Sequence, residues 1–151
     1  MANNSKREQI ILADVEILQS IEAIKTVKRT LQSYSDLRDN FALTQLPVAA
    51  IIGRLPVPTS HIDNRTGFVD YAVSRLVVDV YVYFQENVDM DTVLSSLLDD
   101  MWAALYQNPS RNGLCMYTTI EMSEQNHQVW SPFVAFQVKV IHAYQHTTGG
   151  I

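Results

Sequence analysis

The sequence predicts an α+β fold, an α/β sandwich in which a mixed four-stranded sheet carries two helices on one face, in the order α-β-β-α-β-β. Two observations predict it. Two segments repeat apolar residues at every third or fourth position, as the buried face of a helix does. Four other segments alternate apolar and polar residues, or are continuously apolar, over the length of a strand. The 151 residues, 47% hydrophobic and 18% charged, suit a single domain spanning residues 1–151.

The first expected element is an N-terminal helix over residues 5–31. Ser5 is the expected N-cap, and Glu8 stands at the third helical position, as in a capping box. A helix of about 25 residues would be about 38 Å long. The apolar residues that recur along one face of it are Ile11, Val15, Leu18, Ile21, Ile24, Val27 and Leu31.

A short apolar strand and a long loop are expected next. The run Leu46–Gly53 is almost continuously apolar, which is typical of a strand buried on both faces or at a subunit contact. Residues 56–70 include two prolines, Asn64 and Gly67, and predict a long loop. Loops of this length in compact domains are usually functional or mobile.

The second strand, over Val73–Gln85, alternates between an apolar and an amphipathic face. Tyr81 and Tyr83 belong to the amphipathic face and can contact both water and another surface. The residues expected to face the core are Leu76, Val78, Val80, Val82 and Phe84.

The second half of the chain predicts a helix and two strands. The helix is expected over Asp91–Tyr106, where leucines and Met101 form an apolar stripe. Strands are expected over Leu114–Glu124 and Pro132–Tyr144, and residues 145–151 are expected to form a flexible tail.

The composition excludes several classes of function. With 16 acidic and 11 basic residues the formal net charge is −5, which argues against a protein whose main task is to grip nucleic acid. No apolar run approaches the roughly 18 residues of a membrane span, and Met1–Glu8 lacks the apolar stretch of a secretory signal. We therefore expect a soluble chain made in a cytoplasm and not bound to a membrane.

The metal-ligating residue types predict no metal centre and no cofactor. His142 and His146 stand four positions apart, but on a strand that spacing separates them by about 13 Å. Cys115 is the only cysteine, so it forms no internal disulfide, and its apolar neighbours favour a small buried side chain.

The other candidate catalytic residues predict no active site. Ser60, His61 and Asp63 are the residue types of a hydrolase triad, but neighbours in a loop do not supply triad geometry. Asp99 and Asp100 are adjacent on a helix and cannot face each other, so we expect solvated surface charges.

Aromatic residues favour a protein interface. Tyr81, Tyr83, Trp130 and Phe133 could stack RNA bases, but that function needs nearby lysine and arginine, and this half of the chain is acidic. Trp130 could instead close the edge of the core. The residues expected at a subunit interface, three of them in or beside the long loop, are Arg65, Phe68, Tyr71, Tyr81, Tyr83 and Trp130.

With this order of elements, the chain resembles the tail terminator proteins of long-tailed bacteriophages. The likeness covers about Glu8–Tyr144 and consists of patterns of residue class. The segments that carry it are the helix Ile11–Leu31, the strands Leu46–Ile51 and Arg75–Val82, the helix Val93–Leu105, and the closing strand Phe133–Val140 with Ala143-Tyr144.

The resemblance implies a structural virion protein without catalytic activity. Proteins of this family form a hexameric ring that caps the tail tube and presents a surface to the head-completion or neck protein, while DNA passes through the lumen. The implied location is the tail/neck junction of the virion. Two alternatives stay open: another head-tail neck or completion protein, and a small ligand-binding α/β domain built around His61, Asp63 and Arg65.

Overall fold

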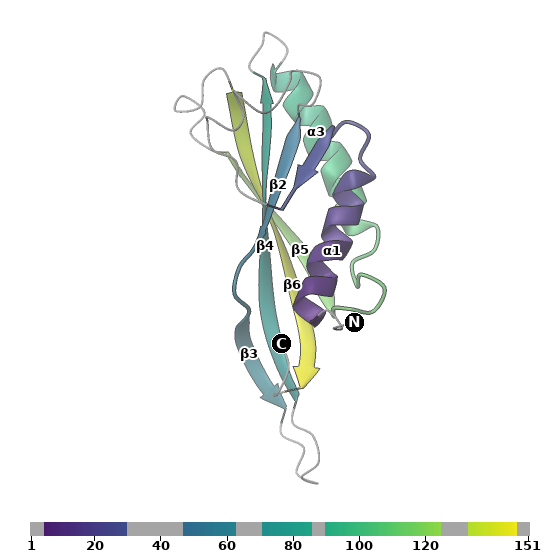
Figure 1. Cartoon of the computed structure of the whole chain (residues 1–151), viewed down its shortest axis with the longest axis vertical. Helices are drawn as coiled ribbons and strands as arrows, with labels where there is room; N and C mark the ends of the chain where they lie inside the picture. The colour runs from purple at the N-terminus through teal and green to yellow at the C-terminus, as the bar shows by residue number, and fades with distance from the viewer. Residues whose placement is uncertain (1–4, 30–46, 63–70, 86–89, 125–132, 148–151) are drawn as a thin grey trace.

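A computed structural model describes residues 5–29, 47–62, 71–85, 90–124 and 133–147. Over these residues the fold is α+β, as predicted, with two helices and a mixed sheet (Figure 1). The sheet has six strands where four were predicted. The two additional strands, β1 (Thr26–Lys28) and β3 (Val57–Ile62), lie in segments that were expected to be helix and loop.

Helix α1 spans Lys6–Gln19 and is shorter than predicted. Ser5 is its N-cap, with the Glu8 backbone N–H donating to Ser5 Oγ over 3.1 Å. The helix ends at Ser20, and the chain turns through residues 20–25 into β1. At 1.5 Å per residue its 14 residues are about 21 Å long, not 38 Å.

The prediction of a longer helix was wrong because the turns that follow α1 keep buried apolar residues at the same three-residue spacing as a helix does. The backbone N–H of Ile21 donates to Leu18 O, and that of Ile24 donates to Ile21 O. Ile21 and Ile24 are therefore buried, 6% and 5% exposed, although they lie beyond the helix.

The sheet has the order β1-β2-β4-β6-β5, and β3 pairs with β4 beyond the end of β2. β1 is parallel to β2, and the other pairs are antiparallel. The remaining strands are β2 (Val48–Gly53), β4 (Tyr71–Gln85), β5 (Tyr117–Glu124) and β6 (Phe133–Thr147).

Two of the predicted irregular segments are partly strand. The expected loop 56–70 includes β3, in which Pro58 pairs with Ser74 before a bulge between Pro58 and Ser60. An edge strand tolerates a proline because the missing N–H faces no partner. The expected tail 145–151 begins with three residues of β6, which pair with β4. Residues 63–70 and 148–151 lie outside the described residues.

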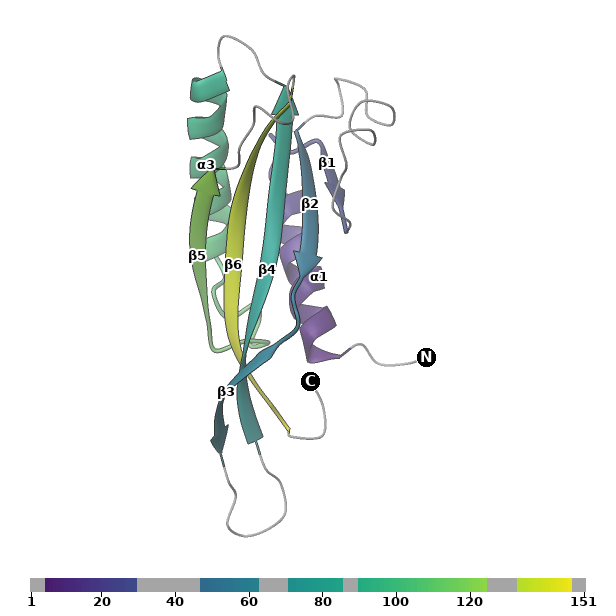
Figure 2. The ribbon, with the colours of Figure 1, turned by 90° about the vertical axis from the view of Figure 1, so that its left-hand side faces the viewer.

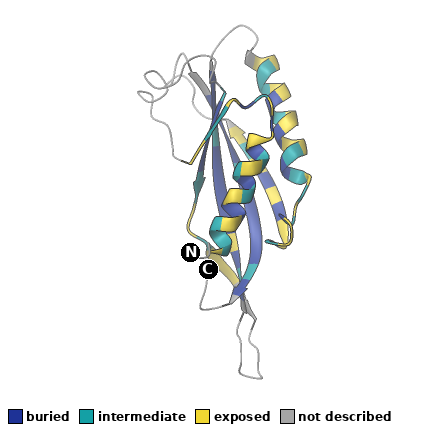
Figure 3. Ribbon diagram, turned by 45° about the vertical axis from the view of Figure 1, so that its right-hand side comes forward, coloured by how far each residue is buried: buried dark blue, intermediate teal, exposed yellow. Residues whose placement is uncertain are grey.

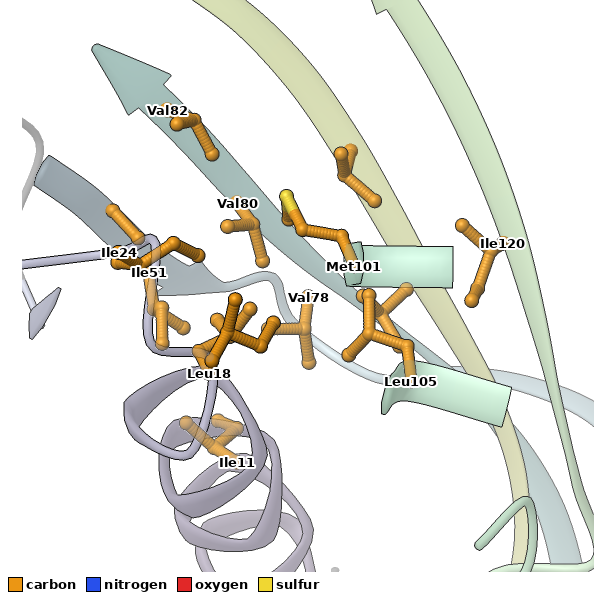
Figure 4. Packing of buried hydrophobic residues seen from close by; sticks show 14 of the residues in the cluster. Ile11, Leu18, Ile24, Ile51, Val78, Val80, Val82, Met101, Leu105 and Ile120 are labelled. Carbon is orange, nitrogen blue, oxygen red and sulfur yellow. The ribbon is translucent and has the colours of Figure 1, made fainter. Parts of the chain in front are cut away.

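Both helices cover the same face of the sheet, so the core is a single layer between the helices and the sheet (Figure 1, Figure 3). The predicted inward face of β4 is confirmed, since its alternate residues from Leu76 to Phe84 are 0–3% exposed. The side chains of Leu18 on α1 and of Met101 and Leu105 on α3 (Met90–Tyr106) meet this face, as Figure 4 shows.

α1 packs closely against the end of β2 at Gly53. A Cβ placed on Gly53 would collide with Ile11 Cδ1 and lie 2.8 Å from Arg7 Nη2. The Arg7 guanidinium donates to Gly53 O over 2.8 Å, which holds the start of α1 against the end of β2. Glycine at this position therefore sets the distance between the helix layer and the sheet.

The central strands are longer than the helix layer. β4 and β6 pair over 15 residues each, and with β3 they continue past the start of α1 (Figure 2). Within the described part of the chain, neither helix is long and apolar enough to cross a membrane.

Candidate functional site

A buried polar cluster joins α1, β6 and the turn that follows α3. The Asp14 carboxylate accepts from Arg111 Nε over 2.8 Å and from His142 Nε2 over 2.6 Å. All three side chains are fully buried. Arg111 Nη1 also donates to Leu105 O and Asn108 O, over 2.8 and 2.6 Å.

The second ring nitrogen of His142, Nδ1, lies close to two small side chains. One is on the turn that follows α3 and the other is on β5. His142 Nδ1 lies 2.9 Å from Thr118 Oγ1 and 3.7 Å from Cys115 Sγ. The Thr118 hydroxyl and the Cys115 thiol both donate to Pro109 O. When the Thr118 hydroxyl gives its one hydrogen to Pro109 O, its oxygen is left to accept from Nδ1, while the Asp14 carboxylate accepts from Nε2. This pattern of hydrogen bonds favours the doubly protonated, imidazolium form of His142.

The pKa of His142 agrees with this assignment. Burial alone would lower the pKa, but the hydrogen bonds to Asp14 and Cys115 and the Asp14 charge raise it above its ordinary value of 6.5. The cluster thus places one carboxylate between two cations, Arg111 and His142.

The cluster has the residue types of a cysteine hydrolase but not its accessibility. A nucleophile must meet a substrate, and Cys115 is 6% exposed while Asp14 and His142 are 0% exposed. The thiol also donates to a backbone carbonyl. The cluster links α1, the turn after α3 and the sheet, so its role is structural. Cys115 is buried, as predicted.

Asp14 was missed by sequence reasoning, although a signal was present. It stands one helical turn from Ile10, Ile11 and Leu18, on the apolar face of α1. A carboxylate at such a position is expected to have a buried cationic partner. The sequence separation of 128 residues between Asp14 and His142 left that partner unidentifiable from spacing alone.

His146 lies on the same face of β6 as His142 but has different neighbours. Its Nε2 is 2.6 Å from Ser74 Oγ, and its ring lies 5.3 Å from that of Tyr144. No group of three or more histidine, cysteine, aspartate or glutamate side chains able to hold a metal ion occurs among the described residues.

The sheet face away from the helices carries a second ion pair. Asp79 accepts from Arg54 Nε over 2.5 Å and from Gln137 Nε2 over 2.6 Å. Beside it on β4, Tyr81 is half-buried and Tyr83 is 2% exposed. Burial and the neighbouring Tyr81 raise the pKa of Tyr83 to about 12.

Most of the predicted interface residues lie outside the described part of the chain. Arg65, Phe68 and Trp130 belong to segments that the structure does not describe, and Tyr71 begins β4 with a side chain that is not described. The interface built on these residues stays a prediction.

The candidate catalytic residues of the expected loop are likewise not brought together in the described structure. Ser60 and His61 belong to β3, their side chains are not described, and Asp63 lies beyond the described range. Asp99 and Asp100 are exposed, as predicted.

Exposed apolar side chains gather at the two edges of the sheet. At one edge Leu55 is 85% and Val57 57% exposed, and at the other Met116 is 58% and Tyr117 55% exposed. Sequence reasoning did not single out these four residues. Val57 and Tyr117 end one row of directly paired residues, which runs Val57, Arg75, Ala143, Tyr117 across β3, β4, β6 and β5.

Two depressions lie along α3. A groove of about 710 Å³ separates the end of α1 from the second half of α3 and is lined by residues that include Glu22, Asp100 and Tyr106. A cavity of about 220 Å³ between α3 and the β5–β6 pair is lined by Leu94, Leu98, Met122, Ser123 and Phe136. Trp102, which is 49% exposed, packs edge-on against Tyr106 at 4.8 Å.

Comparison with family models and with curated proteins gave no match for this chain.

Proposed function

We propose that the chain is a structural virion protein whose copies form a hexameric ring. The ring terminates the tail tube of a bacteriophage and joins it to the head-completion or neck protein, and DNA passes through its lumen. The observation that carries the proposal is the position of four exposed apolar residues, Leu55, Val57, Met116 and Tyr117: they lie at opposite edges of one sheet, where copies placed side by side would bury them.

The buried clusters support a structural role. In the part of the chain that the structure describes, Asp14 and Cys115 both contact His142 beneath α1, where the three side chains tie the helix layer to the sheet. Reaching them would require α1 to leave the sheet. We therefore propose that the chain performs no bond-making or bond-breaking chemistry.

The charge of the chain supports passage of DNA rather than its retention. A formal net charge of −5 leaves few cations to neutralise phosphates, so a lumen formed by this chain would hold DNA weakly. A tube-end ring has to let the genome through, and weak binding suits that task.

Electron microscopy of virions that carry a labelled copy of the chain tests the proposal. We expect the label at the head-proximal end of the tail tube, and we expect tubes of irregular length and unattached heads when the chain is absent. A label on the capsid side of the connector, with tubes of normal length in the absence of the chain, would instead identify another neck protein. A label at neither place would refute a role at the junction.

A further inference from the structure

We infer that neighbouring copies of the chain meet head to tail, with the β3 edge of one copy packed against the β5 edge of the next. The β3 edge is defined here by Leu55 and Val57 together with Arg75 on the adjoining strand β4, and the β5 edge by Met116, Tyr117 and Glu121. The inference rests on the proposed function only for the number of copies that close the ring.

One exposed apolar residue of each edge, Val57 and Tyr117, lies at the same height on the sheet. Val57 and Tyr117 end one row of paired residues, and directly paired residues point to the same face, here the face away from the helices. Three strand spacings separate them by about 14 Å. Each edge exposes two large apolar side chains, so the edges offer matching surfaces that a contact would remove from water.

The distribution of charged residues over the two sides of the sheet favours a head-to-tail contact over a symmetric one. The described segments on the β2–β3 side, residues 5–29 and 47–62, hold six basic and four acidic residues. Residues 91–124, which form α3, the following turn and β5, hold five acidic residues and one basic residue, the buried Arg111. A symmetric contact would bring like charges together, whereas a head-to-tail contact pairs the basic side with the acidic side.

Individual exposed residues place these charges beside the apolar patches. Arg75 is exposed and lies next to Val57 in the shared row. Glu121 is exposed and lies on the same face of β5 as Tyr117, because residues two and four positions apart on a strand share a face.

The form of the β3 edge favours contact through side chains rather than through added strands. Pro58 lacks a backbone N–H, and the bulge between Pro58 and Ser60 breaks the regular ladder of β3. Both features block the pairing of another strand along this edge. Because Val57 and Tyr117 are level, each contact adds a copy beside the last, which permits a closed ring rather than a rising filament.

Disulfide cross-linking between variants of the full chain that each carry one introduced cysteine tests the pairing. The variants are Val57→Cys and Tyr117→Cys, and the native Cys115 is buried and bonded within its own copy. Under mild oxidation we expect no dimer from either variant alone and a disulfide-linked dimer from an equimolar mixture. A mixture of Leu12→Cys with Tyr117→Cys is the control, since Leu12 is exposed on α1, which covers the opposite face of the sheet from Val57 and Tyr117, and we expect it to give no dimer.

The cross-linking results test the contact and the proposed hexameric ring separately. The double variant V57C/Y117C should give a ladder of linked copies, and a ladder that ends at six supports both proposals. A ladder that closes at another number supports the contact and contradicts the hexamer. Dimers from either single variant would overturn the head-to-tail arrangement. So would failure of both the Val57–Tyr117 mixture and a second mixture, Leu55→Cys with Met116→Cys.

Discussion

His142 gives the buried cluster a pH dependence whose direction follows from its geometry. Because Asp14 and Cys115 raise its pKa above the ordinary 6.5, the folded chain binds the imidazole proton more tightly than the unfolded chain does. The resulting stabilisation is complete below pH 6.5 and is lost as the pH rises through the raised pKa.

The variant His142→Gln should remove this part of the pH dependence. We expect the free energy of unfolding of the wild type, measured in urea from about pH 6 to about pH 8.5, to fall relative to that of the variant. Thr118→Val is the control, because it alters a partner of the ring and keeps the titrating group. Parallel curves for wild type and H142Q would show that folding does not shift the pKa of His142, and a rise of the wild type relative to H142Q would show that folding lowers this pKa.

Asp14 supplies the negative charge that pairs with both Arg111 and His142 in the buried cluster. Asp14→Asn keeps the shape of the side chain but leaves Arg111 and His142 buried without a counter-charge. Breaking a fully buried pair in this way costs about 3–5 kcal/mol of unfolding free energy, measurable by urea denaturation.

A double variant checks that this cost comes from the pairing. D14N/R111M should lose less stability than the sum of its two single variants, since it removes charge from both sides. Strict additivity would mean that Asp14 and Arg111 contribute independently.

At the scale of elements, one close contact sets the spacing between the helix layer and the sheet. Gly53→Ala would drive a methyl group into Ile11, so α1 or β2 must shift. We expect a loss of about 1–3 kcal/mol in the free energy of unfolding, as for other overpacked sites. Adding Ile11→Val removes the colliding Cδ1 atom and should return part of that loss. If G53A and G53A/I11V differ only by the cost of I11V alone, the collision is not the cause.

The elements that could be predicted from sequence are those whose local pattern and tertiary environment agree. α3, β2, β4 and β6 fall where periodicity places them, because each has one clearly apolar face against one core. The end of α1 could not be predicted, since Ile21 and Ile24 continue the helical spacing through turns. β3 could not be predicted either, because the two prolines and the polar residues of this segment are typical of a loop. The segment is a strand because it pairs with β4.

At the scale of the whole molecule, the candidate site is less predictable than the fold. Sequence reasoning expected an interface and assigned it to aromatic residues, but Tyr83 is nearly covered within one copy of the chain. The exposure of Val57 and Tyr117 depends on which strands end the sheet, and strand order follows from pairings between distant segments. Local patterns do not specify such pairings.

The distribution of charge over the whole molecule predicts how association responds to substitution. Arg75→Glu and Glu121→Arg should each weaken association of the chain about tenfold, because each places a like charge at the contact. The double variant R75E/E121R restores opposite signs and should recover part of the affinity in sedimentation experiments. Lys28→Glu, at β1 and outside the defined edges, is the control for a general effect of charge. Equal weakening by all three single variants would contradict the assigned contact.

Native mass spectrometry of the purified wild-type chain tests the central claim most directly, namely that copies of this 17.1 kDa chain assemble with one another into a ring. We predict one closed species with six times the mass of the chain, dissociating as salt is raised because opposite charges meet at each contact. A chain that stays monomeric at high concentration and low salt would contradict the account.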